Sequence, residues 1–108
     1  GAGVIDVRMT EEFEDRAIKG SVNMPLFRLR EYASQLEKGR KYVVYCNTGE
    51  RSAAAAFILQ KMGFDACALQ GGLSAMIKQA EKLEDVIAIR RHNADHQVFS
   101  ELESFFQP

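Results

Sequence analysis

The most constraining feature of the sequence is a short cysteine-containing loop between an apolar run and an Ala-rich run. The loop reads Cys46-Asn47-Thr48-Gly49-Glu50-Arg51-Ser52. The run before it, 42–45, is short and rich in β-forming residues, which predicts a buried strand. The run after it predicts a helix, because Ser is favoured at a helix cap and Ala is the strongest helix former. The sequence therefore places Cys46 in a tight loop between a strand end and a helix N-terminus.

This placement favours a reactive cysteine. Backbone N–H groups and the positive dipole end at a helix start stabilise a nearby anion, so the Cys46 thiolate should form more readily than in a free cysteine. Gly49 permits the backbone conformation that a tight loop needs. Arg51 supplies a cation that can bind an oxyanion in bidentate fashion. A lone cysteine is often only a small buried hydrophobe, but here the glycine, the arginine and the helix start converge on one loop.

Three motifs occur in an order that resembles the rhodanese family, over roughly residues 4–78. The first runs from Val4-Ile5-Asp6-Val7-Arg8 through Glu12-Phe13 to Ile18-Lys19-Gly20-Ser21-Val22-Asn23-Met24-Pro25-Leu26. The second is Tyr45-Cys46 through Arg51-Ser52, and the third is Gly71-Gly72-Leu73-Ser74-Ala75. Two positions outside the loop depart from the pattern: Ala17 stands where the family often has His, and Met76 where it often has Trp.

The resemblance implies a sulfurtransferase that carries sulfur as a Cys46 persulfide. It implies that loop N–H groups from Asn47 to Ser52 hold the terminal sulfur, with Thr48 and Ser52 hydroxyls adding hydrogen bonds and Arg51 orienting an anionic donor. Glu50 lies at the loop rim, where its carboxylate should repel a dianionic donor such as thiosulfate. We therefore expect weak thiosulfate affinity, or a neutral or cationic natural partner.

The length of the loop bears on the alternatives. Cysteine phosphatases, some of which share this fold, have a longer loop than the four residues between Cys46 and Arg51, and they usually have His where Tyr45 stands. A shorter loop suits one transferred sulfur atom better than a phosphoryl group. A binding or regulatory module of a larger protein is the second alternative. The abrupt start at Gly1, without Met, supports it and suggests a domain excised from a longer chain.

Composition sets the outer limits. The chain has 108 residues, 46% of them hydrophobic, and a formal net charge of −1. This fits one globular domain and argues against electrostatic attraction to nucleic acid or membrane. The two cysteines form no CxxC motif and no disulfide framework, and no signal peptide is visible, so we expect a cytoplasmic protein. The rhodanese resemblance, and not composition, implies the partners: a small sulfur donor, either thiosulfate or a persulfide, and a thiol or protein acceptor. It also implies a mechanism that needs no metal or organic cofactor.

Strands alternating with helices predict an α/β fold: a rhodanese-like parallel sheet flanked by helices, with an additional C-terminal helix. We expect strands at 4–7, 41–45 and 65–69. The expected helices are at 11–16 with Thr10 as cap, 26–37, 52–62, and 73 to about 83. Residues 1–83 should form the rhodanese-like domain and 84–108 an extension. Apolar residues at helical spacing in this extension predict an amphipathic helix, which covers the sheet or docks on a second domain or a dimer partner: Val98, Leu102, Phe105 and Phe106.

Other polar and sulfur-containing residues have less specific interpretations. Asp6 and Arg8 are predicted to form a structural pair at a strand end, although such residues also face the site in α/β folds. Cys67 is interpreted as a buried hydrophobe in a strand, and only secondarily as a resolving cysteine. Arg28 and Arg30 are predicted to be solvated, with one of them available to assist an anionic substrate. His92 and His96 lack a third ligand and are predicted to be solvated.

Overall fold

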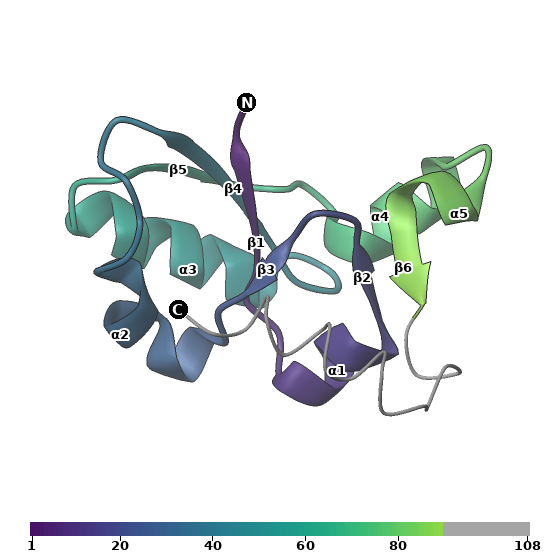
Figure 1. Cartoon of the computed structure of the whole chain (residues 1–108), viewed down its shortest axis with the longest axis horizontal. Helices are drawn as coiled ribbons and strands as arrows, with labels where there is room; N and C mark the ends of the chain where they lie inside the picture. Colours follow the sequence, from purple (N-terminus) through teal and green to yellow (C-terminus); the bar gives the residue numbers. More distant parts are fainter. Residues whose placement is uncertain (90–108) are drawn as a thin grey trace.

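The computed structural model describes residues 1–89, and a four-stranded parallel sheet forms its centre (Figure 1). In spatial order the strands are β3 (Val22–Asn23), β1 (Gly3–Asp6), β4 (Lys41–Tyr45) and β5 (Asp65–Ala68). All three neighbouring pairs are parallel, so their carboxyl ends lie at one edge. The predicted α/β class and flanked parallel sheet are confirmed.

The helices divide between two faces of the sheet because successive side chains of a strand point to opposite faces. Val44 of β4 packs in the larger core, and the next residue, Tyr45, packs in the smaller one. The larger core lies beneath the helical segments η1 (Leu26–Arg28), α2 (Leu29–Ala33) and α3 (Glu50–Lys61). The smaller core lies beneath α4 (Gly72–Gln79) and α5 (Leu83–Val86).

A second, two-stranded sheet was not predicted. After α1 (Thr10–Asp15) the chain forms β2 (Arg16–Ile18), which pairs antiparallel with β6 (Ile87–Ile89). The Lys19 N–H also donates to the Val86 carbonyl at 2.8 Å. Each strand is three residues long and its partner is distant in sequence, so neither carries a recognisable periodic pattern. This pairing places residues 87–89 of the predicted extension beside β2, in the N-terminal part of the chain (Figure 1).

The predicted start of α1 is wrong by one residue. Met9, not Thr10, occupies the cap, and its N–H donates to the Glu12 carboxylate at 3.0 Å. The helix ends at Asp15 because Arg16 already has the extended backbone of β2. The carboxylate of Glu12, three residues after the cap, therefore satisfies the backbone N–H of the cap residue itself.

Two longer helices were also predicted with wrong ends. The segment 26–37 starts as η1 and continues as α2 only to Ala33, because the N–H groups of Gln35 and Leu36 then bond three residues back in turns. The segment 73–83 is interrupted at Ala80, which is extended, and α5 follows as a separate short helix. Boundaries of this kind depend on local turns that apolar spacing does not encode.

The predicted C-terminal helix and both histidines lie outside the described residues. Within residues 1–89, none of the helices has the length and apolar character needed to span a bilayer. The same part of the chain contains no group of three or more His, Cys, Asp or Glu side chains arranged to hold a metal ion.

Candidate active site

The Cys46 loop begins where β4 ends and closes at the first turn of α3. Gly49 has a φ of 127°, in the region that favours glycine, and it occupies the N-cap of α3. The helix therefore starts at Glu50, and the prediction of Ser52 as the cap is wrong. Ser52 is the third residue of the helix, within its first turn, and its side chain is fully buried next to the cysteine. This shift places the N–H groups of the first helical turn directly around the sulfur.

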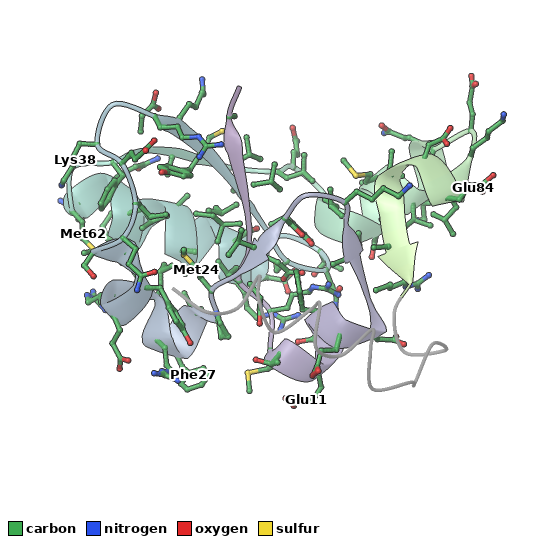
Figure 2. All side chains as sticks on the ribbon, viewed as in Figure 1. Glu11, Met24, Phe27, Lys38, Met62 and Glu84 are labelled. Carbon is green, nitrogen blue, oxygen red and sulfur yellow. The ribbon has the colours of Figure 1, made fainter. Side chains whose placement is uncertain are left out.

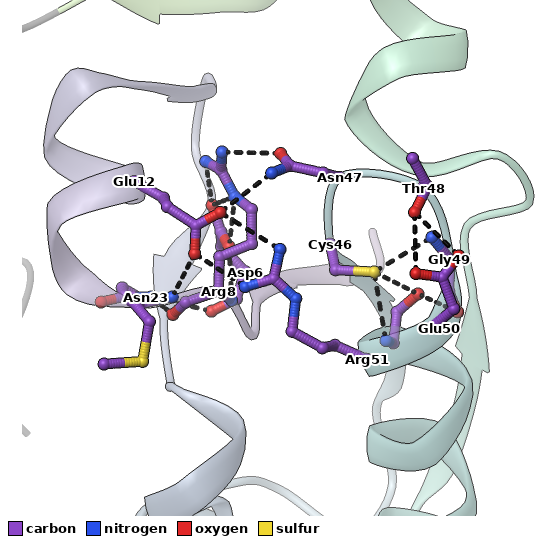
Figure 3. Close-up of polar contacts among 12 residues, drawn as sticks. Asp6, Arg8, Glu12, Asn23, Cys46, Asn47, Thr48, Gly49, Glu50 and Arg51 are labelled. Atoms are coloured by element: carbon purple, nitrogen blue, oxygen red, sulfur yellow. Dashed lines mark hydrogen bonds and ion pairs between the residues drawn. The ribbon is translucent and has the colours of Figure 1, made fainter.

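The sulfur of Cys46 points into this turn (Figure 3). The backbone N–H groups of Gly49 and Ser52 donate to Sγ at 3.1 and 3.3 Å, and the thiol lies 3.4 Å from the Ser52 hydroxyl oxygen. Burial alone would raise the pKa of the Cys46 thiol, but hydrogen bonds from the Ser52 side chain and from the Ser52, Gly49 and Thr48 amides outweigh it and lower the pKa. The loop is thus built to hold a sulfur anion.

Helix α4 supports the loop from behind. The N–H groups of Leu73 and Ser74 donate to the carbonyls of Cys46 and Asn47 at 2.9 and 3.0 Å. A Cβ on Gly72 would lie 2.5 Å from the Cys46 carbonyl oxygen and 2.6 Å from that of Asn47. The Gly71-Gly72 pair therefore serves close backbone packing, the interpretation that a bare Gly-Gly pair favours, and α4 fixes two peptide groups of the loop.

The side chains of Asn47 and Arg51 turn away from the sulfur toward α1 (Figure 3). Arg51 donates to both carboxylate oxygens of Glu12, from Nη1 at 2.7 Å and from Nη2 at 3.1 Å. Asn47 Nδ2 donates to the same carboxylate at 2.9 Å. Glu12 was missed as a site residue because its place in the first turn of α1 was explained by the helix dipole alone. Its presence in the first rhodanese motif was the signal that could have identified it.

The hydroxyl of Thr48 does not face the sulfur. It donates to both oxygens of the Glu50 carboxylate, at 2.9 and 3.0 Å, and both residues lie toward the outer side of the loop. Of the two hydroxyls expected to assist, only that of Ser52 contacts Cys46. Glu50 keeps its predicted place in the loop, in the first turn of α3.

Asp6 and Arg8 form the predicted structural pair. The Arg8 guanidinium donates to both Asp6 oxygens, with Nη2 to Oδ2 at 2.6 Å, and both side chains are almost fully buried. Arg8 also donates to the Arg16 carbonyl at 2.7 Å and to Asn47 Oδ1 at 3.1 Å. Desolvation would lower the pKa of Arg8, but the hydrogen bonds and charge of Asp6 raise it. The pair joins the end of β1 to the loop through Asn47.

A cavity of about 320 Å³ lies beside this polar network, lined in part by Arg8, Glu12, Asn47 and Ser74. Cys46 does not line it, so the cavity adjoins the supports of the loop and not the sulfur.

The position of Tyr45 has a structural explanation: its hydroxyl accepts the Ile18 N–H and bonds to the Ser21 hydroxyl, both at 3.0 Å.

The structure also gives the exposure of Cys67, Arg28 and Arg30. Cys67 is exposed on β5, so its prediction as a buried residue is wrong. The error arose because β5 is an edge strand that carries exposed residues on both sides of Ala66. Arg28 and Arg30 are both exposed, as predicted, and Arg28 pairs with Glu31 at 3.0 Å.

Comparison with known proteins supports the resemblance. The chain is 35% identical to the thiosulfate sulfurtransferase PspE of Escherichia coli over 71 residues, which cover 64% of this chain and 68% of PspE. It is 32% identical to a tRNA sulfurtransferase of Histophilus somni over 66 residues, covering 57% of this chain but only 14% of that protein. These relatives range from a protein of similar size to a far longer one.

Solved structures agree in fold. A rhodanese-related protein from Thermoplasma volcanium superimposes with a TM-score of 0.70 at 36% identity, covering 75% of this chain and 81% of that one. The Alr3790 protein from Anabaena gives a TM-score of 0.76 at 29% identity, covering 94% and 76%. The family model of the rhodanese-like domain matches residues 1–79, and the chain therefore belongs to the rhodanese-like domain family.

Proposed function

We propose that this chain is a sulfurtransferase that moves a sulfane sulfur from a donor to a thiophilic acceptor through a persulfide on Cys46. The observation that carries the proposal is the sulfur of Cys46 accepting two backbone N–H groups at the start of α3. These donors lower the pKa of the thiol, and the thiolate is the reactive nucleophile. The similarity to a thiosulfate sulfurtransferase supports the same reaction class.

The first step loads the cysteine. The Cys46 thiolate attacks the outer sulfur of thiosulfate, a new S–S bond forms, and the S–S bond of the donor breaks. Sulfite leaves with the electron pair of that bond, so no proton or external oxidant is needed. The N–H groups of Gly49 and Ser52 would hold the terminal sulfur of the persulfide, as donors fixed in place before the reaction.

The second step unloads it. A thiolate on a small molecule or a protein, or cyanide in a test tube, attacks the terminal sulfur and leaves Cys46 as thiolate again. The Ser52 hydroxyl lies 3.4 Å from Sγ, close enough to hydrogen-bond to the sulfur both as persulfide and as thiolate. Apart from the donor and the acceptor, both steps use only groups of this chain.

The test is intact-protein mass spectrometry after incubation with thiosulfate or a small persulfide. Wild type should gain the mass of one sulfur atom, and Cys46→Ser should not. Cys67→Ser is the matched control, because Cys67 is exposed and can collect sulfur non-specifically. Loss of the adduct in Cys67→Ser, or an equal adduct in Cys46→Ser, would refute the proposal.

Glu50 provides a second test of donor chemistry. Its carboxylate lies in the first turn of α3, in the same loop as the sulfur, and should repel a dianion. Glu50→Gln should therefore increase thiosulfate turnover at low salt, with the gain shrinking as salt screens the charge. An unchanged or reduced rate would argue against repulsion by this residue.

A binding module within a larger protein is the second candidate, favoured by the small fraction of the tRNA sulfurtransferase that this chain matches. Failure of every donor to load Cys46 in a folded protein would favour this role. A phosphatase is disfavoured by the four residues between Cys46 and Arg51, and hydrolysis of an aryl phosphate by wild type but not Cys46→Ser would revive it.

A further inference from the structure

Arg51 is the only basic residue of the loop, and its guanidinium is already occupied. Two N–H groups bind the two oxygens of Glu12, the paired geometry that arginine also offers to an external oxyanion. In Figure 3 the Arg51 side chain runs toward α1, whereas Cys46 Sγ points the opposite way, to the amides of the loop. An anionic donor that used this same pair of N–H groups would have to displace Glu12.

Glu12 is held firmly in that role. Besides Arg51, its carboxylate accepts the Met9 N–H at 3.0 Å and Asn47 Nδ2 at 2.9 Å. The hydrogen bonds from Arg51 lead the interactions that lower the pKa of Glu12 to about 2, so it stays ionised at neutral pH. A ligand that takes Arg51 from Glu12 must therefore leave an ionised carboxylate without its strongest partner.

The charge around the sulfur follows from this pairing. With Arg51 neutralised by Glu12, the remaining charged side chain of the loop is the carboxylate of Glu50, which bonds to Thr48. The electrostatic attraction left for a donor comes from the backbone N–H groups at the start of α3. Such a site can stabilise one negative charge on sulfur, but it offers little to the sulfonate end of thiosulfate.

We propose that Glu12 is a specificity-determining residue: by holding Arg51 it selects sulfur donors that carry no sulfonate, the hydropersulfides of small thiols, over thiosulfate. This inference rests on the proposed sulfurtransferase function. With such a donor, the Cys46 thiolate attacks the outer sulfur of the neutral R–S–SH form and the donor S–S bond breaks. The leaving thiolate takes the electron pair, and the proton remains with the outer sulfur or passes to that thiolate.

The experiment measures single-turnover loading of Cys46 by quenched intact-mass analysis, at low salt, over a range of concentrations of each donor. The donors are thiosulfate and the hydropersulfide of an uncharged alkyl thiol. Glu12→Gln should lower the half-saturating thiosulfate concentration by roughly five- to tenfold, because Arg51 becomes available for the sulfonate. Loading by the hydropersulfide should change by less than about twofold, since that donor has no group for the guanidinium.

Two controls isolate the role of Arg51. Glu11→Gln makes the same charge change on the exposed side of the same helix, and it should leave both donors unaffected (Figure 2). The double variant Glu12→Gln/Arg51→Gln keeps the net charge of wild type, and it should lose the gain in thiosulfate binding. A gain that persists in the double variant, or appears equally in Glu11→Gln, would overturn the proposal.

The remaining outcomes are also decisive. Thermal unfolding of each variant checks folding. If Glu12→Gln is unfolded, Glu12→Asp replaces it in the loading experiment, because this variant shortens the side chain but keeps its charge. Unchanged or weaker thiosulfate binding in a folded variant that still loads from the hydropersulfide would refute this inference alone. No loading of wild type by either donor would refute the proposed function and this inference together.

Discussion

The Asp6–Arg8 and Glu12–Arg51 pairs lie on either side of the Asn47 side chain, and they differ mainly in burial. Asp6 and Arg8 are 0% and 3% exposed, whereas Glu12 and Arg51 are 31% and 36% exposed. Asn47 bridges them, accepting from Arg8 at 3.1 Å and donating to Glu12 at 2.9 Å. The inner pair is almost fully buried at the end of β1, whereas the outer pair is partly exposed and open to exchange with solvent or ligand. Similar chemistry therefore contributes to folding in one place and, under the proposal above, to donor selection in the other.

Breaking the inner pair should have the largest effect. Asp6→Ala leaves the Arg8 charge buried without its main partner, which should reduce the free energy of unfolding by about 3–5 kcal/mol. Urea unfolding followed by circular dichroism measures this loss. The double variant Asp6→Ala/Arg8→Met, which also removes the buried cation, should recover part of the stability. A loss below about 1 kcal/mol in Asp6→Ala would show that water reaches the pair.

The outer pair should contribute less, and its contribution should depend on pH. Glu12→Gln should cost about 1 kcal/mol at neutral pH, a value discounted for the partial exposure of both side chains. The folded-state pKa of Glu12 is lowered from 4.5 to about 2, chiefly by the hydrogen bonds from Arg51. The stabilisation of the folded state by Glu12 is therefore fully present above pH 4.5 and is lost as the pH falls through about 2.

Urea unfolding of wild type and Glu12→Gln at several pH values between neutrality and pH 2 would test this. The difference in unfolding free energy should be constant near neutrality and should shrink toward acid. A difference that grows toward acid, or that never appears, would mean that Glu12 is not ionised and paired in the folded protein.

A third pair extends the comparison to the surface and should have the smallest effect. Arg28 and Glu31 are 48% and 66% exposed and lie 3.0 Å apart. The hydrogen bond from Arg28 to Glu31 raises the pKa of Arg28, but solvent screens such a pair almost completely. Glu31→Gln should unfold at the same urea concentration as wild type. A clear destabilisation would break the proposed link between burial and contribution.

Much of this arrangement could be predicted from the sequence, and particular residues show why. The strand at 41–45, the Ala-rich helix after it and Gly49 between them each carry a strong local preference, so the position of Cys46 followed directly. Asp6 and Arg8 are only two residues apart in sequence, which made their pairing predictable. Their near-complete burial came only with the structure.

The partners that were missed are those far apart in sequence. Glu12 and Arg51 are separated by 39 residues, and β2 and β6 are joined across a still longer stretch of chain. No local pattern specifies which carboxylate meets a given arginine, because that depends on how α1 packs beside the loop. Exposure of Cys67 was missed for a related reason: whether a short strand lies inside a sheet or at its edge depends on its neighbours.

The two hydrogen bonds from α4 to the carbonyls of Cys46 and Asn47 have a geometric consequence for the thiol. A trans peptide group is flat, and its N–H points opposite to its C=O. Because α4 draws these two oxygens toward itself, the N–H groups of Asn47 and Thr48 must point away from α4. Helix α4 thus orients donors in a loop to which it contributes no residue. The Thr48 N–H is one of the donors that lower the pKa of Cys46. A side chain at Gly72 would press on the Cys46 and Asn47 carbonyls, so a position 26 residues further along the chain than Cys46 should influence that pKa.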